Sequence, residues 1–408
     1  SLLGDTPSGH VFTPQESLNS FQSGFDVSTI RTPLNTSIGF LHAEKFDLEK
    51  DRSLSYIISV NAENSYAIQE GVDRTFAYQS TGISYKTDFI TTDNHYRTSL
   101  TGLLGLNYNT NRFKLAYNSL FIRTTDNLIK DQFGVANAET GTGTNKTLIR
   151  TNQLDQSDYW NNQLLGEYAI TEDKSQTVKA GASYALTKYN QPDRKAFSGI
   201  KTDNDGIIAS IAGNNFIKQY LEITGNSYFS GLAEYNLKFG ADKGHKLTVG
   251  YNGNMSDMES SYRFISPTPG PNIDAPLNSI DDQLNGYIAG GAFNFRESSN
   301  STYKAILKEG ANAGYANLLY KFNDKFELNG GVRFESTNRE TKYRTQGSFD
   351  EPYVTLNYDK TYFLPSLNAK YSVTEKANVR LAGGITYTKP VIMEAYPIEY
   401  INADGTSM

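Results

Sequence analysis

The four histidines are the first residues to test for chemistry, because histidine binds metals and transfers protons near neutral pH. They are His10, His42, His95 and His245. No two of them have a spacing that would bring both imidazoles to one metal ion. The chain also contains no cysteine, which removes thiolate ligands and thiol nucleophiles. We therefore expect solvated histidines and no metal or other cofactor.

Two glycine-containing segments resemble ligand-binding loops but lack residues that such loops need. The segment GTGTNKT (141–147) has no glycine before Lys146, and no strand–helix unit follows it, as a phosphate-binding loop requires. The segment KTDNDGIIAS begins like a calcium-binding loop, but Lys201 occupies its first position and Ala212 its twelfth. Neither side chain offers the oxygen ligand that calcium needs at those positions. No Gly-x-Ser-x-Gly segment occurs either. The sequence therefore predicts no enzymatic activity.

Aromatic residues among polar ones are the best candidates for binding, because their rings stack on sugars and on other rings. The candidate ligand-binding residues are Tyr159, Trp160, Tyr220, Tyr262, Phe264, Tyr287, Phe293, Phe295 and Tyr303. For Trp160, the single tryptophan of the chain, a place at a membrane interface is the favoured alternative. Arg123, Arg263 and Arg296 could attract an anionic ligand, although single arginines among acidic neighbours are usually solvated.

The elements that carry these residues show a period of two. In KFELNGGVRFES (325–336), apolar residues and glycine alternate with Glu327, Asn329, Arg333 and Glu335. Side chains on a strand alternate between its two faces, so this segment has one apolar face and one polar face. Such a strand belongs either to a soluble sheet or to an outer-membrane barrel, in which lipid covers the apolar face.

The same unit recurs as six predicted hairpins, and therefore as twelve strands. Each hairpin joins two alternating segments through a short turn rich in polar residues. The predicted pairs are 33–46 with 54–66, 102–108 with 113–123, 162–170 with 177–189, 228–239 with 246–254, 313–322 with 325–336, and 362–373 with 378–388. One further segment, 214–223, is compatible with a short helix.

The connections between hairpins are long, unlike the turns within them. They cover residues 69–95, 126–157, 190–225, 263–307 and 344–353 and are rich in Gly, Asn, Asp, Ser, Thr and Pro. Alternation of short turns with long loops is typical of an outer-membrane barrel, with short periplasmic turns and long extracellular loops. Tyrosine and phenylalanine also gather beside the short turns, where an interfacial girdle is expected. The prediction is an all-β, antiparallel transmembrane β-barrel.

Composition is consistent with this fold and excludes several classes of protein. The 408-residue chain has a formal net charge of -6 and no cluster of lysine and arginine, which argues against nucleic acid as a partner. No run of about 18 apolar residues occurs, so a transmembrane helix is not expected.

Over roughly residues 30 to 404, the sequence resembles the TonB-dependent outer-membrane receptors of Bacteroidetes-type bacteria. The resemblance rests on YNQPDRKAF (189–197), on YFLPSLNAKYSVTEKANVRLAGGITYTKP (362–390) and on EAYPIEY (394–400). Lys389 departs from the pattern, because many members have arginine there. The resemblance implies uptake of a siderophore, cobalamin, oligosaccharide or peptide across the outer membrane, driven by TonB and without chemistry on the ligand. It also implies contact with membrane lipid and a surface lipoprotein as a further partner.

Two family features are not visible in the chain: the plug domain that engages TonB, and a last strand that ends on an aromatic residue. We therefore expect residues 1–30 to precede the strands and residues 31–408 to form part of a larger barrel of 22 strands, the number found in plugged transporters. A passive channel, or a structural or adhesive barrel without a plug, is the alternative function. A soluble β-protein that binds carbohydrate is a second alternative.

Overall fold

The structure is a computed structural model of the whole chain. It describes residues 3–22, 24–49, 51–79, 82–136, 146–212, 215–240, 242–345, 347 and 349–389. Most of the GTGTNKT segment and all of EAYPIEY lie outside the described residues.

The described residues form two helices and fifteen strands. The helices are α1 (Pro14–Phe21) and α2 (Ile280–Ala289). The strands are β1 (Thr36–Leu48), β2 (Arg52–Gln79), β3 (Gly82–Asn109), β4 (Phe113–Ala136), β5 (Thr147–Ala169), β6 (Gln176–Lys201), β7 (Gly206–Ser210), β8 (Ile217–Phe239), β9 (His245–Pro267), β10 (Asn272–Pro276), β11 (Phe295–Glu297), β12 (Lys304–Lys321), β13 (Phe326–Tyr343), β14 (Val354–Thr374) and β15 (Ala377–Gly384).

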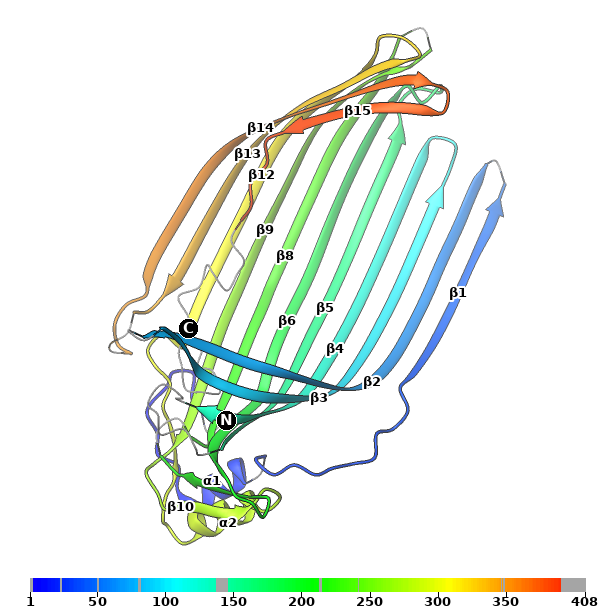
Figure 1. Cartoon of the computed structure of the whole chain (residues 1–408). Helices are drawn as coiled ribbons and strands as arrows, with labels where there is room; N and C mark the ends of the chain where they lie inside the picture. The colour runs from blue at the N-terminus through cyan, green and yellow to red at the C-terminus, as the bar shows by residue number, and fades with distance from the viewer. Residues whose placement is uncertain are drawn as a thin grey trace.

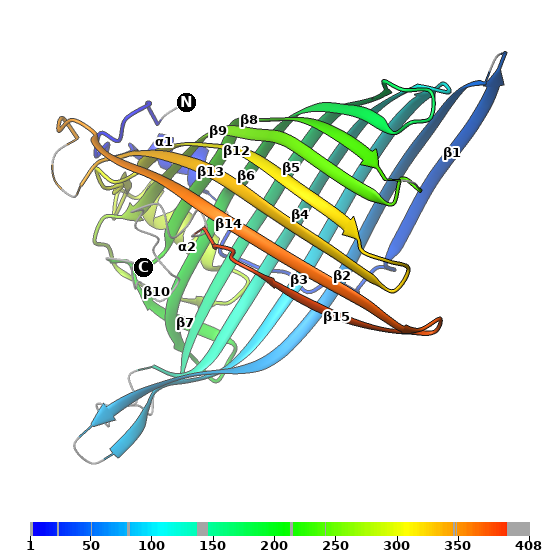
Figure 2. The same cartoon turned by 90° about the horizontal axis from the view of Figure 1, so that it is seen from above.

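Twelve of these strands form one curved antiparallel wall (Figure 1). Their order is β1-β2-β3-β4-β5-β6-β8-β9-β12-β13-β14-β15, and each pairs with its neighbour along the path. The twelve predicted strands are these twelve, so the hairpin prediction is confirmed. The view from above shows the wall bent into a trough, with β1 and β15 at its two edges (Figure 2).

The two faces of the wall differ in chemistry as the alternation predicts. Val332 and Phe334 of β13 lie beside Pro365 and Phe363 of β14, and both phenylalanines are more than half exposed (57% and 51%). The opposite face carries charges in matched rows: Lys114 lies beside Glu167, and Lys179 lies beside Glu234. Large exposed apolar side chains on one face, with paired charges on the other, fit lipid outside and water inside.

Contacts that reach across an intervening strand identify the charged face as the concave one. The Tyr315 hydroxyl on β12 donates a hydrogen bond to Glu234 on β8 at 2.9 Å, over Gly250 of β9. A Cβ at Gly250 would lie 2.4 Å from the Tyr315 ring, so glycine is what lets the ring cross β9. Side chains converge in this way on the inside of a curved sheet, and we call this face the lumen face.

Aromatic residues gather at the short turns, as predicted for an interfacial girdle. Tyr320, Phe322 and Phe326 form a chain of ring contacts around the β12–β13 turn, and Tyr371 lies beside Phe326. The short turns all lie at one end of the wall (Figure 1), which is the periplasmic end by the general topology of such barrels.

Three of the five predicted long loops, 69–95, 126–157 and 190–225, are wrong in large part because wall strands continue into them. The connections 263–307 and 344–353 do lie mostly between wall strands. Residues 69–79 and 82–95 belong to β2 and β3, each of which has 28 residues. A tilted strand needs only about 9–11 residues to cross a membrane, so the far parts of these strands rise beyond it. The predicted helix at 214–223 is also wrong, because β8 begins at Ile217 and pairs with both β6 and β9.

A compact cap occupies the end of the wall opposite the short turns. It contains α1, α2, β7, β10 and β11, together with the nearby ends of β6, β8 and β9 (Figure 1). Within the described residues, neither helix is long and apolar enough to cross a membrane. The cap lies at the end that the general topology of such barrels makes extracellular, opposite the short periplasmic turns.

Candidate functional site

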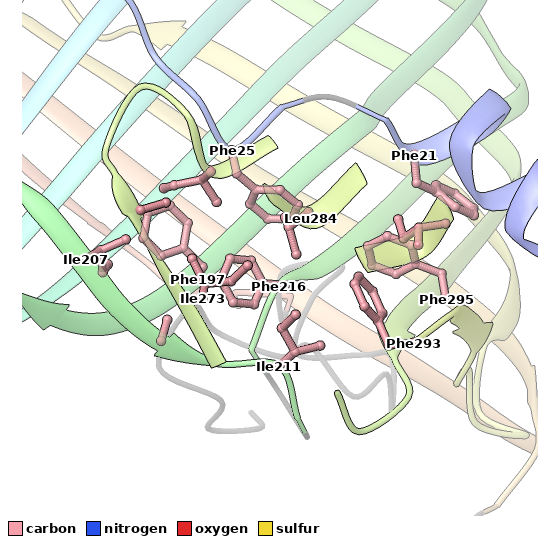
Figure 3. Packing of buried hydrophobic residues seen from close by; sticks show 14 of the residues in the cluster. Phe21, Phe25, Phe197, Ile207, Ile211, Phe216, Ile273, Leu284, Phe293 and Phe295 are labelled. Carbon is pink, nitrogen blue, oxygen red and sulfur yellow. The ribbon is translucent and has the colours of Figure 1, made fainter. Parts of the chain in front are cut away.

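The cap has its own hydrophobic core, built from segments far apart in the sequence (Figure 3). The N-terminal segment contributes Phe12, Phe21 and Phe25, and the rest comes from residues 148 to 295. The fully or nearly fully buried members are Phe12, Phe21, Phe25, Leu148, Phe197, Ile207, Ala209, Ile211, Phe216, Ile265, Ile273, Ala275, Ile280, Leu284, Ile288, Phe293 and Phe295. We call this set the cap core.

Two carboxylates fasten the N-terminal segment to α2. The Asp281 carboxylate accepts hydrogen bonds from the backbone N–H groups of Gly24, Phe25 and Asp26, at 2.9 to 3.3 Å. In return, Asp26 accepts from the N–H groups of Ile280 and Asp281, at 2.7 and 3.2 Å. Ser279 at the N-cap of α2 makes no side-chain capping bond, so Asp26 satisfies donors that would otherwise lack a partner.

Lys218 is an ionisable side chain inside the cap, with only 2% of its surface exposed. Its ammonium nitrogen lies 5.2 Å from the ring centroid of Phe25 and 5.8 Å from that of Phe21. Burial lowers the pKa of Lys218 to about 8, although the negative charges of Asp193 and Asp281 act in the opposite direction. The cap therefore holds a cation under strong desolvation.

This lowered pKa predicts that the cap becomes more stable as the pH rises from about 8 towards 10.5. In that window the unfolded state keeps its proton on Lys218 while the native state has lost it, so the free energy of unfolding increases. Urea unfolding of wild type and Lys218→Met at a series of pH values tests this, and the increase should be absent in the variant. The matched control, Lys376→Met in an exposed periplasmic turn, should keep the wild-type slope. Equal slopes in wild type and Lys218→Met would contradict the assignment.

The structure places most of the predicted ligand-binding aromatics inside the cap. Tyr262, Phe264, Phe293, Phe295 and Tyr303 are each at most 5% exposed. Tyr220 and Tyr287 are half-buried and pack against the cap core. Phe293 and Phe295 belong to the cap core, whereas Phe264 lies in a second small cluster, and Tyr262 and Tyr303 lie in a third. Contact of these side chains with a ligand stays a prediction.

Tyr159 and Trp160, the remaining two predicted residues, lie in the wall on opposite faces of β5. Tyr159 has the same parity as Glu167 and shares the lumen face with it. Trp160 pairs with Phe121 and Leu186 and is 45% exposed on the apolar face. Its indole N–H donates to the Ser119 hydroxyl at 3.1 Å. This position fits the interfacial alternative for Trp160.

Because Trp160 is the single tryptophan, its fluorescence should report the lipid-facing surface directly. We expect brominated phospholipid to quench the Trp160 fluorescence strongly when the chain is in vesicles. Aqueous iodide should quench it weakly. The double variant Tyr159→Trp/Trp160→Phe moves the indole to the lumen face and should reverse this order. An indole in wild type that iodide quenches more strongly than brominated lipid would contradict the assignment of the faces.

Several hollows lie on the lumen face, and two of them are lined by polar side chains of the long strands. One has a volume of about 400 Å³ and is lined mainly by hydroxyls and carboxylates. In it, Asp126 accepts from the Arg97 Nε at 2.9 Å and lies 3.0 Å from the His95 Nδ1. Among the described residues, no group of three or more histidines, aspartates and glutamates has the geometry of a metal site.

The second hollow lies on β12, β13 and β14 and has a volume of about 250 Å³. It is lined by Glu309, Thr337, Asn338, Arg339, Tyr358, Tyr362, Tyr387, Thr388 and Lys389. None of these residues was among the candidates predicted from the sequence. Their alternation with apolar residues marks the lumen face, but only the pairing of three strands and the returning segment 385–389 brings them together.

Comparison with known proteins agrees with this architecture. The sequence model of the family described as "TonB dependent receptor-like, beta-barrel" matches residues 111–406. No curated protein matches the chain.

Several solved structures are similar to the chain at low identity. The ferric-catecholate import receptor Fiu from E. coli K12 matches in its closed form with a TM-score of 0.46, 13% identity, and coverage of 85% of this chain and 49% of that chain. Its open form matches with a TM-score of 0.46, 14% identity, and coverage of 87% and 54%. The siderophore receptor PiuA from Acinetobacter baumannii matches with a TM-score of 0.36 and 9% identity. The match covers 79% of this chain and 53% of that chain.

The chain spans about half of the length of these receptors. The Bacteroidetes-type character of the resemblance stays a prediction, as does a total of 22 strands. The family match covers well over half of the chain. The chain therefore belongs to the TonB dependent receptor-like β-barrel family, which is a family of outer-membrane proteins.

Proposed function

We propose that the protein containing this chain imports a scarce nutrient across the outer membrane in a TonB-dependent manner. The observation that carries the proposal is the lumen face. It is lined with paired charges and polar hollows, and a packed cap lies at its extracellular end. Such a face suits a hydrophilic ligand, and membership of the TonB dependent receptor-like family supports transport as the function. A siderophore, cobalamin, an oligosaccharide and a peptide are the candidate nutrients.

The proposed partners follow from the same assignment. Energy would reach the barrel from TonB through a plug domain, and a surface lipoprotein would assist ligand capture from outside. The chain itself would contact outer-membrane lipid along the apolar face of the wall. It would change the position of its ligand and not its covalent structure.

Two measurements on the full-length protein test the proposal. Cells that express it are supplied with radiolabelled ferric siderophores, cobalamin and maltooligosaccharides, with and without a functional TonB. We expect uptake of at least one compound that stops when TonB is absent or when a protonophore collapses the proton gradient. In planar bilayers the purified protein should conduct no steady ion current. Steady conductance together with TonB-independent uptake would contradict the proposal and support a passive channel.

A further inference from the structure

Nine side chains form a regular array on the lumen face of β12, β13 and β14. Strand pairing places them in three rows of three. The upper row is Glu309, Arg339 and Tyr358, the middle row is Ala311, Thr337 and Lys360, and the lower row is Ala313, Glu335 and Tyr362. The array contains two small side chains, Ala311 and Ala313, both on β12, and the short Thr337 in its middle row. The hollow of about 250 Å³ lies on this array, where Glu309, Thr337, Arg339, Tyr358 and Tyr362 line it.

The segment after β15 covers the hollow from the side of the lumen. Ile385 donates its backbone N–H to the Pro365 carbonyl at 3.0 Å, which extends the contact of β15 with β14 beyond Gly384. The Tyr387 ring then stacks on Tyr362, with centroids 3.9 Å apart and planes 3° apart, and its hydroxyl donates to Glu335. Lys389 completes the lining. The hollow is therefore walled by strands on one side and by this segment on the other.

The size of the hollow fits one small ring. A cavity of about 150 Å³ accommodates benzene, so about 250 Å³ leaves room for a six-membered ring with polar substituents. Tyr358, which is 46% exposed, offers an aromatic ring. The hydroxyls of Thr337, Thr388 and the lining tyrosines supply hydrogen-bond donors and acceptors. Apolar ring faces beside hydroxyls are a general solution for binding hydroxylated rings.

The charges at the hollow favour an anion. Both carboxylates are already paired: Arg339 donates to Glu309 at 2.5 Å, and Arg333 donates to Glu335 at 2.5 Å. Lys360 lies with its ammonium 5.6 Å from the Tyr362 ring centroid, and among the described residues neither Lys360 nor Lys389 forms an ion pair within 4 Å of a carboxylate. The two lysines therefore leave a surplus of positive charge beside the ring-sized space.

We propose that this hollow is a binding subsite for a six-membered ring that carries hydroxyl groups and one negative charge. The inference rests on the proposed function and names the ligand chemistry of one part of the lumen. The ring stacks on Tyr358, its hydroxyls bond to Thr337 and the tyrosine hydroxyls, and its anionic group lies towards Lys360 and Lys389. A dihydroxybenzoate and a uronic acid share this chemistry, and the test separates the two sources.

Calorimetric titration of the full chain in detergent micelles tests the subsite. The anionic probes are 2,3-dihydroxybenzoate and galacturonate, and the neutral partners of the same shape are catechol and galactose. We expect one anionic probe to bind at least tenfold more tightly than its neutral partner. Binding of 2,3-dihydroxybenzoate would identify an aromatic ring as the ligand. Binding of galacturonate would identify a sugar ring.

Three variants locate the binding. Tyr358→Ala should weaken binding about three- to tenfold, as the loss of one aromatic contact implies. Lys389→Gln and Lys360→Gln should each weaken the anionic probe while leaving the neutral partner unchanged. The matched controls are Tyr85→Ala, in an exposed part of β3, and Lys376→Gln, in a periplasmic turn, and both should bind as wild type does.

Two outcomes would overturn the inference. One is no binding of either anionic probe by wild type, and the other is binding that Tyr358→Ala and both lysine variants leave unchanged. Either result would leave TonB-dependent uptake by the full-length protein intact, and uptake is measured separately. Failure of uptake with retained ring binding would instead overturn the proposed function, so the two failures are distinguishable.

Discussion

Phe25→Ala is expected to release the N-terminal segment from the extracellular cap. Phe25 is 2% exposed, and its ring meets Phe216 edge to face at a centroid distance of 5.3 Å and Phe197 at 6.1 Å. Truncating a buried phenylalanine to alanine costs about 3–5 kcal/mol, because apolar contact is lost and a cavity remains. Phe25 is one of the three phenylalanines through which the N-terminal segment enters the cap core, so its loss weakens that attachment.

The loss should spread to α2, because the backbone around Phe25 and the start of α2 share the two aspartates described above. Hydrogen exchange of the amides of residues 24–26, 280 and 281 follows the release, and all five should exchange faster in the variant. The control is Phe363→Ala on the lipid-facing surface, which should leave these five amides as slow as in wild type. Unchanged exchange in Phe25→Ala would show that the segment is held by other contacts.

The wall could be predicted from the sequence because each strand and each short turn is recognised from residues close together in the chain. Each predicted strand has seven or more residues, and each short turn contains Asn, Asp, Gly or Lys between two such segments. In Lys325–Ser336, for example, the alternation alone assigned Phe334 to lipid and Arg333 to the lumen, and both assignments agree with the structure. A slip of one residue in the pairing register would move every apolar side chain to the opposite face of the sheet. A long alternating strand therefore specifies which of its side chains face lipid.

The extensions of the strands could not be predicted, because above the membrane both faces of a strand meet water. Segment 91–95 (TTDNH) contains only polar residues and shows no apolar face, yet it pairs with β2 and β4 along its length. Its backbone hydrogen bonds are satisfied by neighbours and leave no pattern in the side chains. The same composition therefore describes a loop and a solvated strand equally well.

The cap escaped prediction for a different reason, since its contacts join distant segments. Phe12 and Phe295 share a core across nearly 300 residues, and no local pattern connects them. A signal for α1 was present, however. Thr13 accepts from the Glu16 N–H while Glu16 accepts from the Thr13 N–H, a capping box that Thr-Pro-x-Glu spells in the sequence.

The candidate binding residues show how composition misleads in such a protein. The polar segments around the aromatic residues predict exposed rings. In the structure Phe293 and Phe295 are instead buried in the small cap core. Tyr358 and Tyr362, which do line a hollow, lie within a strand of ordinary alternation. Their grouping with Arg339 depends on the register of three strands, which only the structure supplies.

Removal of the Glu297 side chain is expected to have an effect as large as that of the Phe25 change. The Glu297 side chain is 1% exposed and forms an ion pair with Arg263 of β9. The Arg263 guanidinium also lies 5.4 Å from the Tyr303 ring centroid. Its second oxygen accepts from the backbone N–H of Ser8 at 3.0 Å. Glu297→Ala would leave the cation and the N–H without their acceptor in a low dielectric, which costs about 3–5 kcal/mol.

Replacing both partners should cost far less than removing one. In Arg263→Met/Glu297→Leu the buried charge disappears together with its partner, and apolar side chains of similar volume fill the space, a change that is commonly neutral or stabilising. Urea unfolding of the cap, followed by hydrogen exchange of residues 262–265 and 295–297, compares the single and double variants. The control is Glu340→Ala, because Glu340 pairs with Lys342 at 3.1 Å with more than a third of both side chains exposed, and such a pair contributes at most about 1 kcal/mol. If Glu297→Ala and Glu340→Ala cost the same, the buried pair does not hold the N-terminal segment, β9 and β11 together.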